Sequence, residues 1–376
     1  MRIVNNRLLA GIAAAGLVVF AAACGSVEDA PAEVDAGSDD DAGSDADAGS
    51  EEDAGSEDAG GSGDEIEIVT VSKIEGITWF QRMSEGVDMF SEANEGVNAY
   101  QTGPDSDDPA AQVRIVEDLI AQGVDGIIVV PNDPIGIGPV LTRAREAGIV
   151  VGVTEATQLV GTGSIDFDIE SFDNADFGRG FGEGLVEEMG CEGQYATSVG
   201  NLTSESHLLW LEAAIEYIEE TCPDMENVSP TPYENFNDDQ RGRELGDEIL
   251  STFPDLGGYL ATTPSGTSGM ASALRERGIT DGVANVGLTL PSVAGPDLAD
   301  GFMDYGQGWD PAGWGWALNE VALRLIQGEE IQEGDDLGWP LGGYESITLH
   351  EDGELILGND IQVYTDETFP DGNYPF

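Results

Sequence analysis

Residues 126–153 read GIIVVPNDPIGIGPVLTRAREAGIVVGV, in which two apolar runs flank a helix-type segment. The runs are residues 126–130 and 149–153, and the segment between them starts at the turn 131–134 and ends at Gly148. Strands that are apolar on both faces are typical of parallel sheets that helices cover on both sides. The stretch therefore predicts one β-α-β unit of a parallel, doubly wound sheet.

The same alternation extends along the chain on both sides of this unit. Before it, a helix begins at Asp108 and Pro109, an N-cap and a first helical residue, and ends at Gly123. A second series begins after about residue 158. The other predicted strands are 66–71, 97–100, 194–200, 228–233, 258–262 and 283–288, followed by a hairpin of 345–349 with 354–357. The other predicted helices include 205–221, 238–252, 265–277 and 311–327.

These two series cover about 310 residues, which suits two domains better than one. They predict an α/β fold of two doubly wound parallel-sheet lobes joined by a hinge. Open sheets of this kind bind ligands outside the carboxyl ends of their strands. The predicted site is therefore the cleft between the lobes.

The first 24 residues have the pattern of a secretory signal peptide. Arg2 and Arg7 precede the apolar run 8–20, which is too short to span a bilayer, and three alanines lead to Cys24. Small residues directly before a cysteine resemble a bacterial lipoprotein box, in which Cys24 becomes the lipidated first residue. We expect a signal peptide over 1–24 and an extracytoplasmic protein that a lipid anchors to the membrane. The alternative is a soluble secreted protein cut before an incidental cysteine.

Residues 25–64 are an acidic segment with loose Asp-Ala-Gly-Ser repeats. The segment contains 15 acidic residues and no basic one, so it cannot form a core and its like charges favour an extended chain. Its aspartates lack the full ligand pattern and the closing Glu of a calcium hand. We expect a disordered tether.

The charge of the remaining chain is strongly negative. In residues 65–376, 59 of the 74 acidic residues face only 11 of the 13 basic ones, and Lys73 is the single lysine of the chain. Such a surface is typical of proteins that stay folded in strong salt, where screening removes the self-repulsion, so we expect a halophilic source. The same field disfavours nucleic acid and anionic lipid headgroups as partners.

Besides Cys24, the chain contains only Cys191 and Cys222. An even pair outside the reducing cytosol predicts a disulfide. Cys191 precedes a predicted strand and Cys222 ends the helix after it, so both lie at the end of the sheet away from the cleft. A catalytic or metal role is disfavoured because no histidine is near either cysteine in the sequence.

Four segments carry a family resemblance, and they are KIEGITWF at 73–80, VVPNDP at 129–134, NLTSESH at 201–207 and WDPA at 309–312. In this order they resemble type I substrate-binding proteins of ABC importers, in the branch that holds rhamnose, other simple-sugar and autoinducer-2 receptors. The resemblance implies two lobes that close on a solute by a hinge, and ABC permease and ATPase subunits as partners.

The resemblance also implies how the chain divides between the lobes. The N-terminal lobe is expected to hold residues 65–157 plus 286–308, and the C-terminal lobe residues 158–285 plus 309–376. We expect a monomer with no cofactor and no metal.

Candidate ligand-binding residues of the first lobe follow predicted strands. Trp79 and Phe80 offer flat apolar faces for sugar rings, although one of them can simply belong to the core. Asp133 and Glu155 offer carboxylates for hydroxyl groups, although Asp133 can instead cap the helix after it. Lys73 matches the position of the lysine that contacts ligand in autoinducer-2 receptors, and its alternative is a lone surface lysine.

In the second lobe, His207 lies in the first turn of a helix and is a candidate for donating to or accepting from a ligand hydroxyl, with buried packing as the alternative. Asn237 and Asp239 can be ligand groups or merely helix caps. The full second-lobe and hinge set is His207, Asn237, Asp239, Thr263, Trp309 and Asp310.

The ligand is less well specified than the family. Autoinducer-2 receptors combine the lysine with an Asp where Glu155 stands, and ribose-type receptors use an Asp-Arg pair where this chain has Glu155 and Ala156. Neither set is intact. We therefore predict a neutral sugar or sugar-like polyol, with autoinducer-2 as the alternative.

Two other classes of function are weighed against capture for transport. The sequence has no Gly-x-Ser-x-Gly elbow, zinc-protease motif or phosphate loop, but a pair such as Asp133 and Glu155 could in principle process a glycoside. A sensor that presents its solute to a membrane receptor would use the same lobe closure. We predict a protein that is not an enzyme.

The charge analysis makes a prediction about stability. We expect the unfolding temperature to rise steeply between dilute buffer and molar potassium or sodium chloride, because salt screens the repulsion among the acidic groups. Thermal unfolding followed by circular dichroism across a salt series measures this. Equal stability in dilute buffer would contradict the halophilic interpretation.

Overall fold

The computed structural model describes residues 65–365 of the 376-residue chain. The predicted signal peptide, Cys24 and the acidic tether lie outside the described residues. Within 65–365, no helix has the length and apolar character needed to cross a membrane.

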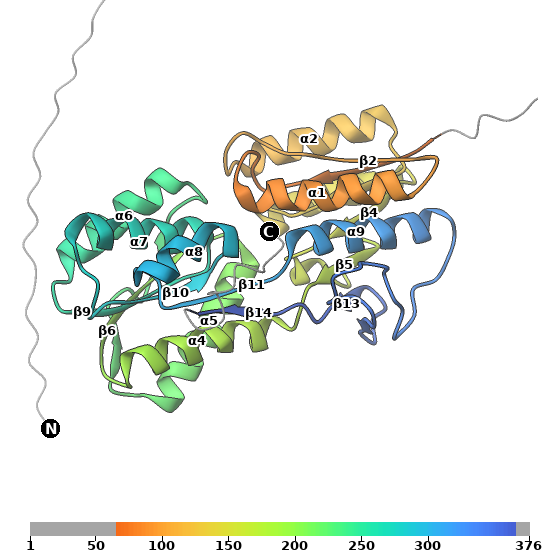
Figure 1. Ribbon diagram of the computed structural model, residues 1–376. Helices are drawn as coiled ribbons and strands as arrows, with labels where there is room; N and C mark the ends of the chain where they lie inside the picture. The colour runs from red at the N-terminus through yellow and green to blue at the C-terminus, as the bar shows by residue number, and fades with distance from the viewer. Residues whose placement is uncertain (1–64, 366–376) are drawn as a thin grey trace, which may run out of the picture. The chain divides into compact units, whose positions relative to one another are not determined.

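The first sheet has seven strands in the order β12-β13-β5-β4-β3-β1-β2 (Figure 1). The strands are β1 (Ile66–Val71), β2 (Val97–Thr102), β3 (Gly126–Val129), β4 (Val150–Val153), β5 (Phe167–Glu170), β12 (Thr348–Leu349) and β13 (Leu355–Leu357). From β2 to β13 neighbouring strands are parallel, and β12 pairs antiparallel to β13.

Helices cover both faces of this sheet. Helices α1 (Thr78–Ala93) and α9 (Pro311–Ile326) pack on one face, where Ile68 belongs to their core. Helices α2 (Pro109–Gln122) and α3 (Pro134–Glu146) cover the other face, where Val69 is buried, and the short η1 (Thr157–Leu159) contacts α3. Opposite faces of β1 are therefore buried by different helix pairs, which explains why the strand is apolar throughout.

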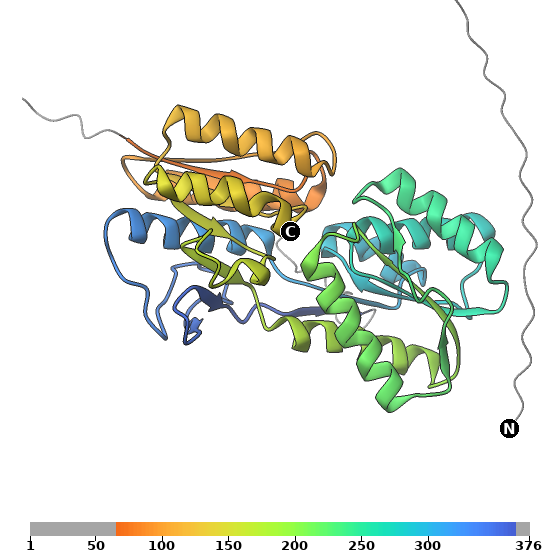
Figure 2. The same ribbon diagram turned by 180° about the vertical axis from the view of Figure 1, so that it is seen from behind.

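The second sheet has the order β14-β11-β10-β9-β6-β7, with β8 pairing with β6. Its strands are β6 (Gly193–Val199), β7 (Met225–Asn227), β8 (Tyr233–Glu234), β9 (Leu256–Ala261), β10 (Ala284–Leu288), β11 (Tyr305–Gly308) and β14 (Gln362–Tyr364). Its helices are α4 (Asn174–Met189), α5 (Glu205–Thr221), α6 (Asp239–Thr252), α7 (Pro264–Arg277) and α8 (Pro291–Asp300). The pair α4 and α5 covers one face, and α6 and α7 cover the other (Figures 1 and 2).

The predicted fold class is confirmed, and the predicted division between the lobes is wrong in three places. Strand β5 extends the first sheet to Glu170, whereas β10 and β11 pair in the second sheet. Helix α9 and the β12-β13 hairpin belong to the first lobe, although residues 309–376 were assigned to the second. The chain therefore crosses between lobes near 171–173, near 309–310 and again between β13 and β14. Periodicity identifies strands but does not tell which of two similar sheets each strand joins.

Local predictions can be compared residue by residue. Asp108 caps α2 through the N–H groups of Ala110 and Ala111, and Gly123 ends the helix in the left-handed conformation, both as predicted. The hairpin around residue 352 is confirmed. Helix α8 was not predicted, and the expected strand 228–233 is replaced by the shorter β7 and β8.

Cys191 and Cys222 form the predicted disulfide. The bond joins Cys191, two residues before β6, to the C-cap of α5, at the end of the second sheet opposite the carboxyl ends of its strands. It closes a loop over a sequence separation of 31 residues. The bond therefore constrains one strand-helix unit without contacting the cleft.

We expect the double substitution Cys191→Ala and Cys222→Ala to lower the free energy of unfolding by about 2–4 kcal/mol, because the unfolded chain gains the entropy of an open loop. Guanidinium unfolding in molar salt measures the change. Reduced wild-type protein should match the variant, and ligand affinity should stay the same. A variant as stable as the oxidised protein would contradict a structural role for the bond.

Candidate functional site

A small cavity lies between the carboxyl ends of strands from both lobes. Its volume is about 20 Å³, which is room for a single water molecule. Seven of the predicted ligand-binding residues line it, together with Ile77, Pro264 and Leu288, and these seven are Lys73, Trp79, Phe80, Glu155, His207, Asn237 and Trp309. Loops far apart in the sequence thus converge as the sheet topology requires.

A buried ion pair forms the polar centre of this cavity. The Lys73 ammonium, in the loop after β1, donates to Oε2 of Glu155, in the loop after β4. Both side chains are less than a tenth exposed. Ser206 of α5 donates to the same Glu155 oxygen at 2.7 Å, so the second lobe also contacts the pair.

Glu155 is held by its backbone as well as by its side chain. Its φ is 54°, in the left-handed region that non-glycine residues seldom adopt. A conformation of this kind persists only where surrounding contacts fix it, and such residues concentrate at functional sites.

His207 supplies a neutral donor to the cavity. The backbone N–H of Gly200 donates to Nδ1 of His207 at 3.2 Å, so the neutral ring carries its proton on Nε2. Burial, with a smaller contribution from the Lys73 charge, lowers the pKa of His207 well below its usual value. The ring is therefore uncharged near neutral pH, with an N–H suited to a ligand hydroxyl.

Aromatic rings form the apolar wall of the cavity. The Trp79 and Trp309 rings meet edge to face with centroids 4.5 Å apart, and Trp309 also contacts Phe172, Phe177, Trp210 and Trp314. Trp309 is 1% exposed and Trp79 5%, so both are chiefly core residues with one edge toward the cavity. The Nε1 of Trp309 has no hydrogen-bond partner among the described residues.

Direct hydrogen bonds join the two lobes beside the cavity. Asn237 of the second lobe donates to Asp107 of the first at 2.8 Å, and Asn201 donates to the same carboxylate at 3.5 Å. Burial is the main cause that raises the pKa of Asp107. Thr203 donates to the carbonyl of Asn132 at 3.0 Å. The structure therefore has the lobes in contact, which accounts for the small cavity.

Strand β5 carries two more buried carboxyl groups close to Glu155. Asp168 and Glu170 are at alternate positions of β5, both almost fully buried. Burial, together with neighbouring carboxylates, raises the pKa of Glu170 to about 7 and that of Asp168 well above its usual value. Asn174 donates to Glu170 at 3.0 Å and accepts from Trp210. This network connects β5 to the start of α4 and to α5.

Three predicted residues do not line the cavity because they cap helices. Asp133 accepts from the N–H of Gly136 at the start of α3. Thr263 caps α7 through Gly266, and Asp310 caps α9 through Ala312. Asp310 also pairs with Arg82 of α1 at 2.9 Å. In this structure the oxygens of Asp133, Thr263 and Asp310 thus serve backbone N–H groups, and their ligand contacts stay a prediction.

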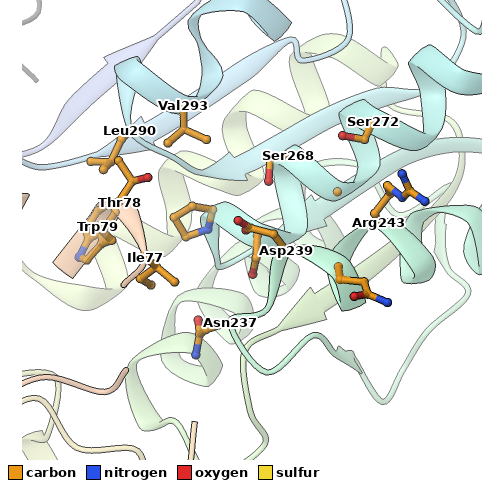
Figure 3. Close-up of a pocket in the computed structure, with 14 residues that line it drawn as sticks. Ile77, Thr78, Trp79, Asn237, Asp239, Arg243, Ser268, Ser272, Leu290 and Val293 are labelled. Atoms are coloured by element: carbon orange, nitrogen blue, oxygen red, sulfur yellow. The ribbon is translucent and has the colours of Figure 1, made fainter. Parts of the chain in front are cut away.

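The remaining predicted residue, Asp239, faces a larger space. This groove has a volume of about 590 Å³ and is lined from α6, α7 and α8 of the second lobe and from the start of α1 in the first (Figure 3). Ile77, Trp79, Asn237 and Pro264 contribute to the walls of both the cavity and the groove.

Sequence reasoning missed Asp107 and Ser206. Asp107 directly precedes the predicted N-cap Asp108, and Ser206 directly precedes the predicted His207. Helix-start signals in the sequence identify the neighbouring residues Asp108 and His207. Asp107 and Ser206 instead form hydrogen bonds with the opposite lobe, which the sequence does not show. Among the described residues, no group of three histidine, cysteine or carboxylate side chains is arranged to hold a metal ion.

Comparison with curated proteins finds the D-ribose/D-allose-binding protein of Pseudomonas aeruginosa, which is 27% identical over 201 residues. That match covers 52% of this chain and 61% of the relative's length.

Among solved structures, LsrB from Clostridium saccharobutylicum in complex with AI-2 aligns with a TM-score of 0.73 at 19% identity, covering 83% of this chain and 100% of that one. A solute-binding protein from Clostridium phytofermentas with bound L-rhamnose aligns with a TM-score of 0.72 at 20% identity, covering 81% and 97%. Likeness at this level of identity concerns the fold.

A family model described as "Periplasmic binding protein domain" matches residues 68–330. That range includes every cavity-lining segment and both sheets except their last strands. With its two doubly wound lobes and the convergence of strand ends between them, this chain belongs to the periplasmic binding protein domain family.

Proposed function

We propose that this protein is an extracytoplasmic solute-binding lipoprotein that captures a neutral sugar or sugar-like molecule between its lobes and delivers it to an ABC permease and ATPase. The observation that carries the proposal is the convergence of Lys73, Glu155 and His207 on one cavity from both lobes, with Ser206 hydrogen-bonded to Glu155. The relatives' ligands, which include ribose or allose and rhamnose, are in accord with a sugar.

The chemistry of the cavity favours a neutral ligand. Lys73 and Glu155 offset each other's charge, and His207 is uncharged, so the polar centre carries no net charge. Carboxylate and hydroxyl oxygens accept from sugar hydroxyls, while the lysine ammonium and the histidine N–H donate to them. The Trp79 edge and Phe80 provide apolar surface for ring C–H groups.

Ligand entry requires the lobes to separate. A cavity of about 20 Å³ cannot hold a sugar ring, and the Asp107–Asn237 and Glu155–Ser206 hydrogen bonds close it. Opening about the crossings near 171–173 and 309–310 would expose these groups, and a sugar would then bridge them on closure.

Binding without chemistry accounts for the site better than glycoside processing. The carboxylate pair weighed for an enzyme was Asp133 with Glu155, and Asp133 caps α3 outside the cavity.

Autoinducer-2 is the second candidate ligand, favoured by the place of Lys73 in the cavity. The lipid anchor at Cys24 and a salt-rich environment belong to the same proposal and rest on the sequence pattern.

A thermal-shift screen tests the ligand class directly. In molar salt, a soluble chain from residue 25, made without the lipidation site Cys24, should show a melting temperature that rises with the concentration of one pentose, hexose or deoxyhexose, because a ligand that binds only the folded protein stabilises it. Autoinducer-2 belongs in the same screen, and a shift with it alone would select the second candidate. Folded protein that responds to none of these compounds would contradict the proposal.

We expect the double variant Lys73→Met and Glu155→Gln to lose at least about tenfold in affinity for the ligand found, because each hydrogen bond to a charged group contributes about 1.5–3 kcal/mol. Titration calorimetry measures the loss. The single variant Lys73→Ala is less informative, since an unpaired buried Glu155 costs about 3–5 kcal/mol of stability.

A matched control removes an ion pair away from the cavity. Arg145 and Asp166 pair at 2.7 Å near the amino end of β4. Arg145→Gln with Asp166→Asn should leave the affinity unchanged. Equal affinities in wild type and in the Lys73 and Glu155 double variant would exclude the ion pair from ligand binding.

A further inference from the structure

The groove beside the cavity offers far more room than the cavity does. Its volume of about 590 Å³ lies within the range of small-molecule sites, whereas the cavity of about 20 Å³ holds one water. The shared wall residues Ile77, Trp79, Asn237 and Pro264 make the groove an outward extension of the cavity. A ligand that extends beyond one sugar ring would enter this space.

Two helices of the second lobe build the polar side of the groove. Helices α6 and α7 cross closely because Gly242 and Gly269 lack side chains, and a Cβ on Gly242 would lie 2.1 Å from the carbonyl oxygen of Ser265. One α6 stripe and one α7 stripe therefore face the same space, and they consist of Asp239, Gln240, Arg243, Ser265, Ser268 and Ser272. Figure 3 labels Asp239 of α6 and Ser268 of α7 among the residues that line the groove.

The opposite side of the groove is apolar. Leu290 and Val293 come from the start of α8, and Ile77 and Trp79 come from the start of α1 in the first lobe (Figure 3). A hydroxyl-binding side that faces an aliphatic and aromatic side is the combination that a sugar ring requires.

The charges in the groove disfavour an anionic occupant. Asp239 and Arg243 have opposite signs, and Arg243 is already paired with Glu276 at 3.1 Å. The formal net charge of the chain is −61, which repels anions from the groove at moderate salt. A carboxylate or phosphate on the ligand is therefore disfavoured.

We propose that the groove is a second saccharide subsite, so that the ligand is a neutral glycoside or disaccharide whose first unit occupies the cavity and whose second unit occupies the groove. This inference rests on the proposed sugar-binding function. The second unit would contact α6 and α7 on one side and Ile77 and Trp79 of the other lobe on the opposite side. It would therefore stabilise lobe closure in addition to the first unit.

Calorimetric titration of the soluble chain from residue 25, made without Cys24, tests the subsite in molar salt. The probes are ribose, rhamnose, glucose and galactose, their methyl glycosides, and neutral disaccharides that carry these sugars at the non-reducing end. We expect a disaccharide to bind about tenfold or more tightly than its parent monosaccharide, because the second unit adds several hydrogen bonds.

Substitutions in the groove separate the two subsites. Ser268→Trp fills the groove from a half-buried position on α7, and it should remove the disaccharide's advantage while leaving monosaccharide affinity within about twofold. The milder double variant Gln240→Ala with Ser272→Ala should lower the affinity for the disaccharide and leave that for the monosaccharide unchanged. It tests the same subsite if the Ser268→Trp variant does not fold. Ser251→Trp, at an exposed position near the other end of α6, is the control and should change neither affinity.

The outcomes distinguish this inference from the proposed function. Monosaccharide binding with no gain for any disaccharide, or a gain that survives both groove variants, would overturn the subsite alone. Tighter binding of a uronic acid glycoside than of its neutral counterpart would overturn the neutral class. Folded protein that binds no saccharide would overturn the sugar-binding function and the subsite with it.

Discussion

The site depends on one buried ion pair, between Lys73 and Glu155. Removing two charges from water is costly, so such a pair persists only where good geometry and further hydrogen bonds compensate. Here the Lys73 carbonyl accepts from Asn132, and Ser206 donates to the Glu155 carboxylate. These two partners come from the loop after β3 in the first lobe and from helix α5 in the second. The ion pair therefore depends on groups from both lobes at the cleft.

Buried carboxylates of the first lobe lie next to two of the places where the chain crosses between the lobes. Glu170 ends β5, immediately before the first crossing of the chain into the second lobe, and Asn174 at the start of α4 donates to it. Asp310 follows the second crossing, where it caps α9 and pairs with Arg82. These two crossings are thus each anchored in the first lobe by a carboxylate.

The two lobes differ in the space that they leave at the cleft. The first lobe presents a tight polar centre that is almost filled by its own side chains, and the second lobe presents helices whose glycines bring two polar stripes together. The ion pair lies at the small cavity of about 20 Å³, whereas Ser268 lines the groove of about 590 Å³. A protein built in this way can combine a specific first contact with a longer ligand.

The sequence by itself determined the fold class, the disulfide pair and most of the cavity. Apolar strands and helix-start signals are local, and the carboxyl ends of parallel strands meet at one edge, so residues such as Lys73, Glu155 and His207 could be assigned to the cleft. Only the tertiary structure decided which sheet β10, β11 and α9 join, because strand pairing is non-local and both sheets have the same pattern. It also decided that Asp133 caps a helix and that Asp107 bridges the lobes, since a carboxylate's partner depends on which N–H group folding brings within reach.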